Sequence, residues 1–106
     1  MTEADFDRAA DEELHALERA FAEYDPDEVD VELASGVLTL TLGDGQKVIV
    51  NSHRAARQIW MAAFRSAWHF SPAPTDGGVR WRTDKDELRE TLSRLLSERL
   101  GRPVRL

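Results

Sequence analysis

The sequence predicts an α+β fold, a two-layer sandwich in which an N-terminal and a C-terminal helix pack on one face of an antiparallel sheet of five or six strands. Apolar residues recur with the helical period at both ends of the 106-residue chain and with period two between them. Each helix has a single apolar stripe, and two such helices beside one sheet bury their stripes most simply on the same face. The other face of the sheet is expected to be open to water.

The first element expected is a helix over residues 4–24. It should end where Asp25 precedes Pro26, because a residue before proline is pushed out of the α region. Its apolar residues follow one another at steps of four and three, as in an amphipathic helix: Phe6, Ala10, Leu14, Leu17, Phe21 and Tyr24.

Three antiparallel strands are expected between residues 29 and 51, where apolar and polar residues alternate. Turn signals separate them at Gly36 and at Gly43-Asp44-Gly45. The apolar residues that would face the helices are Val29, Val31, Leu33, Leu38, Leu40, Leu42, Val48 and Val50.

The rest of the sheet is expected from three short apolar fragments that follow a polar loop over residues 52–57. These fragments lie at residues 58–61, 68–70 and 79–82. Residues 71–78 read Ser-Pro-Ala-Pro-Thr-Asp-Gly-Gly, a composition typical of a loop.

The final helix is expected to start near Thr83, a candidate N-cap with three acids in the first turn, and to end at Gly101. Its apolar stripe consists of leucines at Leu88, Leu92, Leu95, Leu96 and Leu100. With no further repeat or linker, residues 1–106 are expected to form a single domain.

Trp60 is predicted to lie on the open face of the sheet. If Ile59 and Met61 point toward the helices, the period-two geometry of a strand sends Trp60 to the opposite side. An exposed tryptophan is unusual and is a preferred anchor of protein interfaces. The alternatives are that the loop over residues 71–78 covers Trp60, or that the strand register is off by one residue.

Charge divides the chain in two. Residues 1–45 hold fourteen acids and two bases, a net charge of −12, whereas residues 46–106 have a net charge of +6. A surface with such a negative potential attracts cations or basic protein patches and repels phosphate backbones. We therefore expect metal ions or a basic protein partner, and no nucleic-acid partner.

Several classes of function have no support in the sequence. The chain has no cysteine, which excludes disulfides, thiolate nucleophiles and cysteine-ligated metals and suits a reducing cytosol. It has no apolar run long enough to span a membrane and no signal peptide. Phosphate loops, HExxH and nucleophile motifs are also absent. We expect a soluble, cytoplasmic protein that does not bind membranes, and the sequence gives no support for hydrolase or kinase activity.

Acids on the first helix are predicted to form one stripe. At 100° per residue, Asp7, Asp11, Glu18 and Asp25 fall within about 40° of one another. The acidity continues through residues 25–32. Clustered carboxylates without thiols are hard oxygen ligands for Ca²⁺, Mg²⁺, Mn²⁺ or iron, and without a fixed loop pattern such sites are weak and partly hydrated.

The alternative is a solvated helix face whose acids only compensate the helix dipole. Dipole compensation explains the acids Glu3 and Asp5, which lie at the N-terminal end of the helix. It does not explain the acids of residues 25–32, because they lie at the C-terminal end, where the helix dipole disfavours negative charge. His15 is either a third ligand beside Asp11 and Glu18 or only a counter-charge among acids. His53 falls in the predicted loop, and His69 is expected to be structural.

Taken in order, these segments resemble the frataxin family in its bacterial, CyaY-like form, over almost the whole chain. The resemblance rests on Asp5-Phe6 at the start of an acidic helix, the acidic junction 24–32, the strand pair at residues 36–42 with the glycine turn after it, Asn51 closing the third strand, Gln58-Ile59-Trp60-Met61-Ala62, and Trp68-His69-Phe70.

The resemblance implies a non-enzymatic accessory protein or regulator of iron–sulfur cluster assembly that is a monomer without metal. Its acidic ridge would bind iron weakly, or other hard divalent cations, and dock on a basic region of the cysteine desulfurase that supplies sulfur to the scaffold protein. Carried over residue by residue, the acidic ridge is Asp11, Glu18, Glu23, Asp25, Asp27, Asp30 and Glu32, with Asp7 added on the helical-wheel argument alone.

The resemblance also implies that Trp60, with Asn51 and Gln58, belongs to the sheet surface used on the desulfurase–scaffold complex. Arg19 and Ala22 stand where bacterial relatives usually carry acids, so we expect a lower metal capacity and better-preserved desulfurase docking. The alternative function is an acidic interaction module with no physiological metal, which would act through charge and Trp60 alone.

Overall fold

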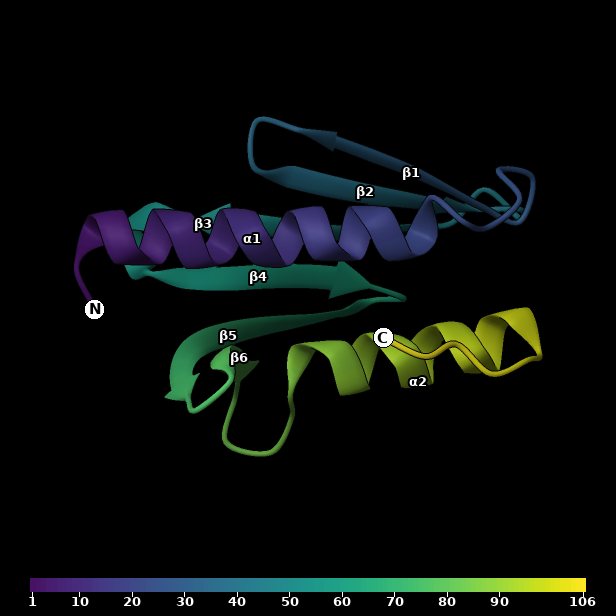
Figure 1. The fold of residues 1–106 in the computed structure, drawn as a ribbon. Coiled ribbons are helices and arrows are strands. Elements are labelled where there is room, and N and C mark those ends of the chain that lie inside the picture. Colours follow the sequence, from purple (N-terminus) through teal and green to yellow (C-terminus); the bar gives the residue numbers. More distant parts are fainter.

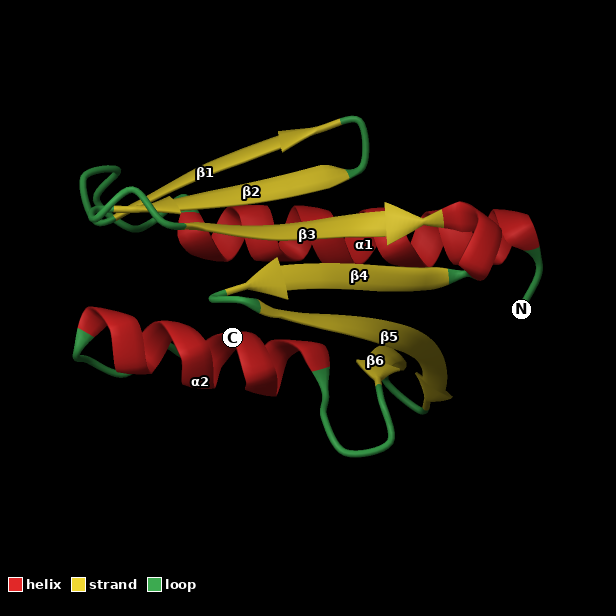
Figure 2. Ribbon diagram, turned by 180° about the vertical axis from the view of Figure 1, so that it is seen from behind, coloured by secondary structure: helices red, strands yellow, loops and turns green.

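Two helices and six strands form the two layers of the molecule in a computed structural model that describes residues 1–106 (Figures 1 and 2). The strands make one antiparallel sheet in the order β1 to β6. This arrangement confirms the predicted fold class. In chain order the elements are α1 (Glu3–Phe21), β1 (Val29–Ala34), β2 (Val37–Leu42), β3 (Lys47–His53), the 3₁₀ helix η1 (Arg54–Ala56), β4 (Gln58–Ala63), β5 (Ser66–Thr75), β6 (Gly78–Arg82) and α2 (Leu88–Leu100).

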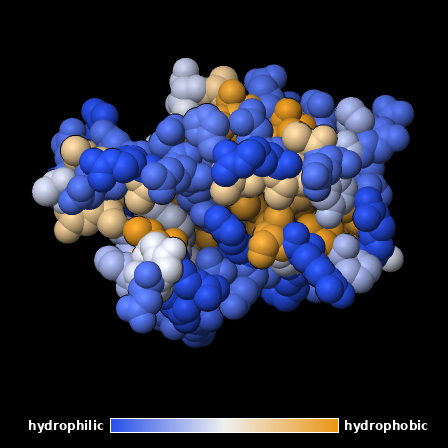
Figure 3. All heavy atoms as spheres, in the orientation of Figure 1, coloured by the Kyte–Doolittle hydropathy of each residue, from blue (hydrophilic) through white to orange (hydrophobic).

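Both helices lie on one face of the sheet, and the view from behind shows the other face uncovered (Figures 1 and 2). The helix α1 packs against β1, β2 and β3, while α2 lies beside β6. Twenty buried apolar residues from both layers form one core. Within it, Trp81 packs edge-to-face on Phe6, with 5.7 Å between ring centroids. Apolar surface also shows between the two helices in Figure 3, while the outer side of α1 is hydrophilic.

The helix α1 is shorter than predicted at its C-terminal end. A capping box between Thr2 and Asp5 begins it, and the backbone N–H of Thr2 lowers the pKa of the Asp5 carboxyl. The helix ends at Phe21, and the ring of Tyr24 folds back on Phe21. Asp25 is therefore not on the helical stripe, which corrects the wheel argument. Instead its carboxylate accepts a hydrogen bond from the Asp27 N–H (2.9 Å) and shapes the next turn.

Residues 71–78 are not a loop as predicted. Ser71 to Thr75 continue β5, and Gly78 begins β6. Proline is tolerated in a strand that has a neighbour on one side only. Pro72 and Pro74 meet this condition because they lie beyond the last residue of β5 that pairs with β4 and face β6 alone. The composition of the segment was a poor guide here, because one-sided pairing is a tertiary property.

The helix α2 begins at Leu88, and its N-cap lies four residues later than the predicted N-cap Thr83. The Thr83 hydroxyl accepts hydrogen bonds from two backbone N–H groups of a separate turn, those of Lys85 and Asp86. The N-cap is Glu87, whose carboxylate accepts a hydrogen bond from the Glu90 N–H (3.0 Å). The acids of this region therefore precede the helix, while Gly101 ends it in the left-handed conformation as predicted.

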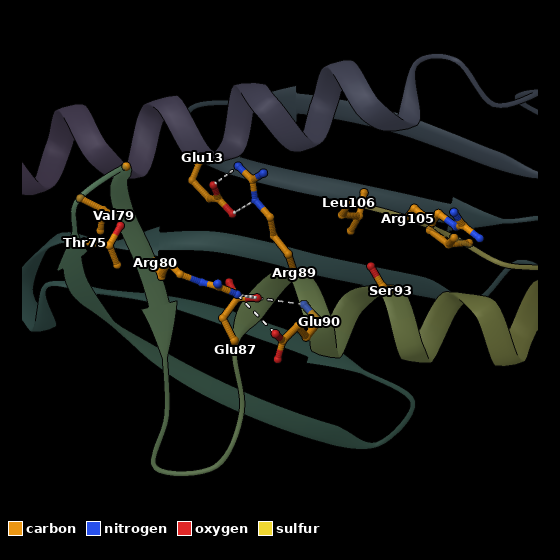
Figure 4. A pocket seen from close by; sticks show the side chains of 12 residues that line it. Glu13, Thr75, Val79, Arg80, Glu87, Arg89, Glu90, Ser93, Arg105 and Leu106 are labelled. Carbon is orange, nitrogen blue, oxygen red and sulfur yellow. Dashed lines mark hydrogen bonds and ion pairs between the residues drawn. The ribbon is translucent and has the colours of Figure 1, made fainter.

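Charged residues between α1, β6 and α2 pair with one another around a hollow of about 790 Å³ (Figure 4). Arg89 donates two hydrogen bonds to the Glu13 carboxylate (2.9 and 2.6 Å), which raise the pKa of Arg89. Arg80 pairs with Glu87 at 3.1 Å and with Glu90 at 3.4 Å. Glu13 and Glu87 are only 6% and 3% exposed, and carboxylates buried to that degree need such partners. These charges hold the two helices and β6 together.

Gly43 allows the β2–β3 turn to pack against the segment that follows α1. Its N–H donates to the Glu28 carbonyl (3.1 Å), and a Cβ at Gly43 would come within 2.7 Å of the Asp27 carbonyl oxygen. We expect Gly43→Ala to lower the free energy of unfolding by about 1 to 3 kcal/mol, because backbone must shift to relieve the overlap. Urea denaturation measures this change.

Gly77→Ala is the matched control for this prediction. A Cβ at Gly77 has no atom within 4 Å, and its φ is not in the left-handed region. Its unfolding free energy should stay the same or rise by about 0.4 to 1 kcal/mol, since alanine restricts the unfolded chain. Equal midpoints for the two variants would show that the contact at Gly43 does not constrain the fold.

Candidate functional site: an acidic ridge and an open sheet face

The acidic ridge wraps around the free edge of the sheet. Asp11, Glu18 and Glu23 come from α1 and its C-terminal end, on the helix side. Asp30 and Glu32 come from β1, the edge strand, where they alternate with the inward-facing Val29 and Val31. They therefore belong to the open side of the sheet. The predicted ridge acids thus lie on two faces of the molecule, on either side of this sheet edge, which a helical wheel alone did not reveal.

Asp7 is engaged within the molecule. Arg54, in η1, donates hydrogen bonds to both Asp7 carboxylate oxygens (3.1 and 2.5 Å) and lies 3.6 Å from a carboxylate oxygen of Glu3. The hydrogen bonds to Asp7 raise the pKa of the Arg54 guanidinium, as a two-point pair between an arginine and a carboxylate does. Of the predicted ridge acids, Asp7 is therefore the least available to an outside cation.

His15 is turned to its own helix. Its Nδ1 lies 2.9 Å from the backbone carbonyl oxygen of Asp11 and 3.3 Å from a carboxylate oxygen of Asp11. Six of the ridge acids have no ion-pair partner in the chain, which leaves their charge available to a partner or a cation. They are Glu18, Glu23, Asp25, Asp27, Asp30 and Glu32.

The ridge acids come closest to a shared hollow at the α1–β1 junction. This hollow of about 550 Å³ is lined by Asp25, Asp27 and Glu28 and by Asp44 of the β2–β3 turn. Asp44 was not among the predicted ridge residues, because only the Gly43 contact brings its turn beside the junction. Arg99 also lines this hollow and reduces the negative potential there.

No three histidine, aspartate or glutamate side chains anywhere in the chain are placed to hold one metal ion together. The predicted ridge therefore offers no set of three carboxylates that converge on one ion, and most of its side chains are exposed. Hard cations bind such groups with most of their water retained, so this donor set suits weak, exchangeable binding of iron and similar ions. It does not suit a resident metal centre.

Trp60 lies on the open face, as predicted. Its neighbours Ile59 and Met61 are 0% and 1% exposed under the helices, while Trp60 is half-buried on the other side. The register is therefore the predicted one. Residues 71–78 belong to the β5–β6 hairpin and not to a separate loop. Asn51 lies directly opposite Trp60 on β3. Gln58 accepts a hydrogen bond from Trp60 Nε1 (2.9 Å), so the structure brings the three predicted partner-binding residues together.

Two histidines stack on Trp60, although His53 was predicted to lie in a loop and His69 to be structural. His53 covers one face of the indole, with 3.7 Å between ring centroids and 14° between planes. His69 covers the other face at 4.2 Å and 13°. The alternation of apolar Trp68 and Phe70 with polar His69 is the sequence signal that would have placed His69 on the open face, and the structure has His69 exposed and Phe70 buried. His53 gave none, because β3 extends two residues past the predicted strand end at Asn51.

The fold and these surfaces define a class of protein: a two-layer α/β sandwich with an acidic edge beside an open sheet face centred on a tryptophan. A sequence model described as "Frataxin-like domain" matches residues 1–102. The chain belongs to the frataxin-like family, whose members are non-enzymatic accessory proteins. None of its helices combines the length and apolarity needed to cross a membrane.

Similar curated proteins carry the name iron-sulfur cluster assembly protein CyaY. The chain is 36% identical to the one from Thioalkalivibrio sulfidiphilus, with 100% of both chains covered. It is 37% identical to the one from Dechloromonas aromatica, which covers 98% of this chain and 97% of that protein. A frataxin from Psychromonas ingrahamii has the same fold, with a TM-score of 0.82 at 23% identity over 99% of this chain and 97% of that one.

Proposed function

We propose that this chain is an iron-binding accessory protein of iron–sulfur cluster assembly, acting without enzymatic activity of its own in the cytoplasm. The observation that carries this proposal is the full-length similarity to proteins named for iron–sulfur cluster assembly, at 36% and 37% identity. The described surfaces add support, because an acidic ridge with six unpaired carboxylates and an aromatic cluster on an open sheet face are features of a docking protein.

The acidic ridge is the proposed contact for a basic region of a cysteine desulfurase. Complementary charge accelerates encounter and fixes orientation more than it adds affinity. The open face around Trp60, with Asn51 and Gln58, is the proposed contact for the desulfurase–scaffold complex. Because Asp30 and Glu32 lie on that same face, one partner assembly is able to touch both surfaces at once.

Iron is the proposed cargo, bound weakly at the six unpaired ridge acids, with the chain a monomer in its absence. The second candidate function, an acidic interaction module with no physiological metal, rests on the same charges. It is favoured by the lack of any three-residue metal cluster. Measuring cation binding separates the two.

Anaerobic ferrous iron, Mn²⁺ or Co²⁺ at millimolar concentration should raise the melting temperature beyond the effect of NaCl at matched ionic strength. Cations that bind the folded ridge better than the unfolded chain stabilise the fold, by about 1.4 kcal/mol at ten times the dissociation constant. The shift should grow with cation concentration. A shift no larger than that of NaCl would remove iron as cargo and leave the interaction module.

Arg54→Gln sharpens this measurement. It removes the guanidinium that engages Asp7 and Glu3, so the cation-induced shift should be larger than in the parent, whatever the starting melting temperature. Arg94→Gln is the control with the same change in net charge, because Arg94 is exposed on α2 and makes no ion pair. Equal shifts in the two variants would show that the cations respond only to net charge.

A further inference from the structure

The geometry points to His53 as a positioning residue that covers one face of Trp60 when neutral and leaves it when protonated. Mild acid would thus open one indole face of the sheet surface while the other face stays covered by His69. The consequence for a partner rests on the proposed function of Trp60, whereas the ring movement itself does not.

The indole of Trp60 has a stacked ring on each face and a hydrogen bond from its Nε1. His53 and His69 lie nearly parallel to it at 3.7 and 4.2 Å, and Gln58 accepts from its Nε1. In this state each indole face carries an imidazole ring, so an outside guanidinium or aromatic ring has no free face on which to stack. Availability of Trp60 is therefore decided by whether one of the two imidazoles moves.

The two histidines differ in how their ring nitrogens are placed. His53 Nδ1 is buried and has no hydrogen-bond partner, whereas His69 is exposed. A neutral imidazole needs only one N–H, so His53 can carry its proton on Nε2 and leave Nδ1 without one. A protonated imidazole has an N–H at both nitrogens. Protonating His53 in place would create a buried, charged donor without an acceptor, which is strongly unfavourable.

The surroundings of His53 provide no charge that would compensate. Arg54 and Arg57 follow it in the chain and carry the same sign as a protonated histidine. The acids nearest in this region, Asp7 and Glu3, are engaged by Arg54. From the adjoining strands, β4 contributes the neutral Gln58 and Trp60, and β5 contributes His69 on the far side of the indole. No carboxylate in this region is therefore free to pair with a protonated His53.

An opposing effect favours the stack, because a cation gains by lying on an indole face. His69 is exposed, so protonating it in place creates no buried donor that would oppose this gain. The protonated His69 ring should therefore stay on the indole. At His53 the cost of burying a charged donor without an acceptor is larger than the gain from the cation–π contact, because the buried group loses its full hydration. Turning the ring out to water hydrates both N–H groups. His53 should therefore leave Trp60 as it protonates, and His69 should remain.

Histidine side chains in general change charge between about pH 5 and 8, and this is the range over which the proposed movement is to be tested. On the surface proposed for partner docking, acidification would convert Trp60 from a covered ring into one with a free face. That face suits a guanidinium or an aromatic side chain of the partner. The binding surface would then respond to pH through one residue that the partner itself need not touch.

Proton NMR of the imidazole Hε1 and Hδ2 resonances tests this inference on the free protein. The ring current of a stacked indole moves these resonances upfield, and Trp60→Leu supplies the reference positions without it. At pH 8 both His53 and His69 should be upfield of the reference. On titration to pH 5, His53 should move to the position it has in Trp60→Leu at the same pH, while His69 should keep its upfield offset.

His53→Phe is the matched variant, because a phenyl ring covers the indole without ionising. In His53→Phe, the Trp60 ring resonances should lose the part of their pH dependence that is caused by protonation of His53. Three results would overturn the inference: no upfield offset at pH 8, an offset of His53 that survives its protonation, or both histidines leaving together. A His53 that stays neutral until the protein unfolds in acid would overturn it equally. Because no partner is present, these outcomes are independent of whether Trp60 binds the assembly machinery.

Discussion

Neutralising Glu18, Asp25 and Asp30 together, as Gln, Asn and Asn, should weaken binding to a bacterial cysteine desulfurase about tenfold at low salt and reduce the salt dependence of what remains. Oppositely charged surfaces raise association rates by about 10 to 10³, and these three carboxylates have no ion-pair partner that would screen them. Binding measured at two salt concentrations checks both parts of the expectation.

The fold should tolerate this triple substitution or be slightly stabilised by it, because like charges along α1 and the junction repel one another. Asn at position 25 keeps an oxygen that accepts from the Asp27 N–H. The control is Asp76→Asn, Asp84→Asn and Glu98→Gln, three exposed acids outside the ridge with the same change in net charge. If ridge and control variants bind alike at low salt, the partner surface lies elsewhere.

Trp60→Ala should abolish most of the effect of this protein in a cluster-assembly assay while costing less stability than a core tryptophan does. Interface anchors contribute about 2 kcal/mol or more to binding, or roughly thirtyfold in affinity. Loss of a core tryptophan costs about 3 to 5 kcal/mol of unfolding free energy, and the half-buried Trp60 should cost less. Urea denaturation and assembly kinetics on the same preparation measure the two quantities.

Trp81→Ala is the companion variant with the opposite expectation. Trp81 is 1% exposed and packs edge-to-face on Phe6, so its removal should cost the full core amount. At temperatures where this variant remains folded, its activity in the assay should stay near that of the parent. Unchanged assembly kinetics in Trp60→Ala would remove Trp60 from the functional surface and leave the acidic ridge as the remaining proposed site.

Local patterns predicted most of the elements because burial imposes them residue by residue. The apolar stripe from Phe6 to Phe21 and the alternation around Leu40 each reflect one face turned to the core. The same alternation placed Trp60 on the open face, between buried Ile59 and Met61. Chain ends of elements were predicted less well. Tyr24 lies outside α1, where its ring packs on Phe21. Thr83 lies outside α2, where its hydroxyl accepts the hydrogen bonds of a separate turn.

The amino-acid sequence by itself determined the class of fold, the division of charge and the face on which Trp60 lies, because periodicity and net charge are properties of the chain. Only the tertiary structure decided which charges are free and which rings touch. Arg54 engages Asp7 across 47 positions, and His53 and His69 meet on Trp60 from two different strands. Such pairs depend on strand register and on side chains brought together from distant segments, and no local pattern encodes the distance between them.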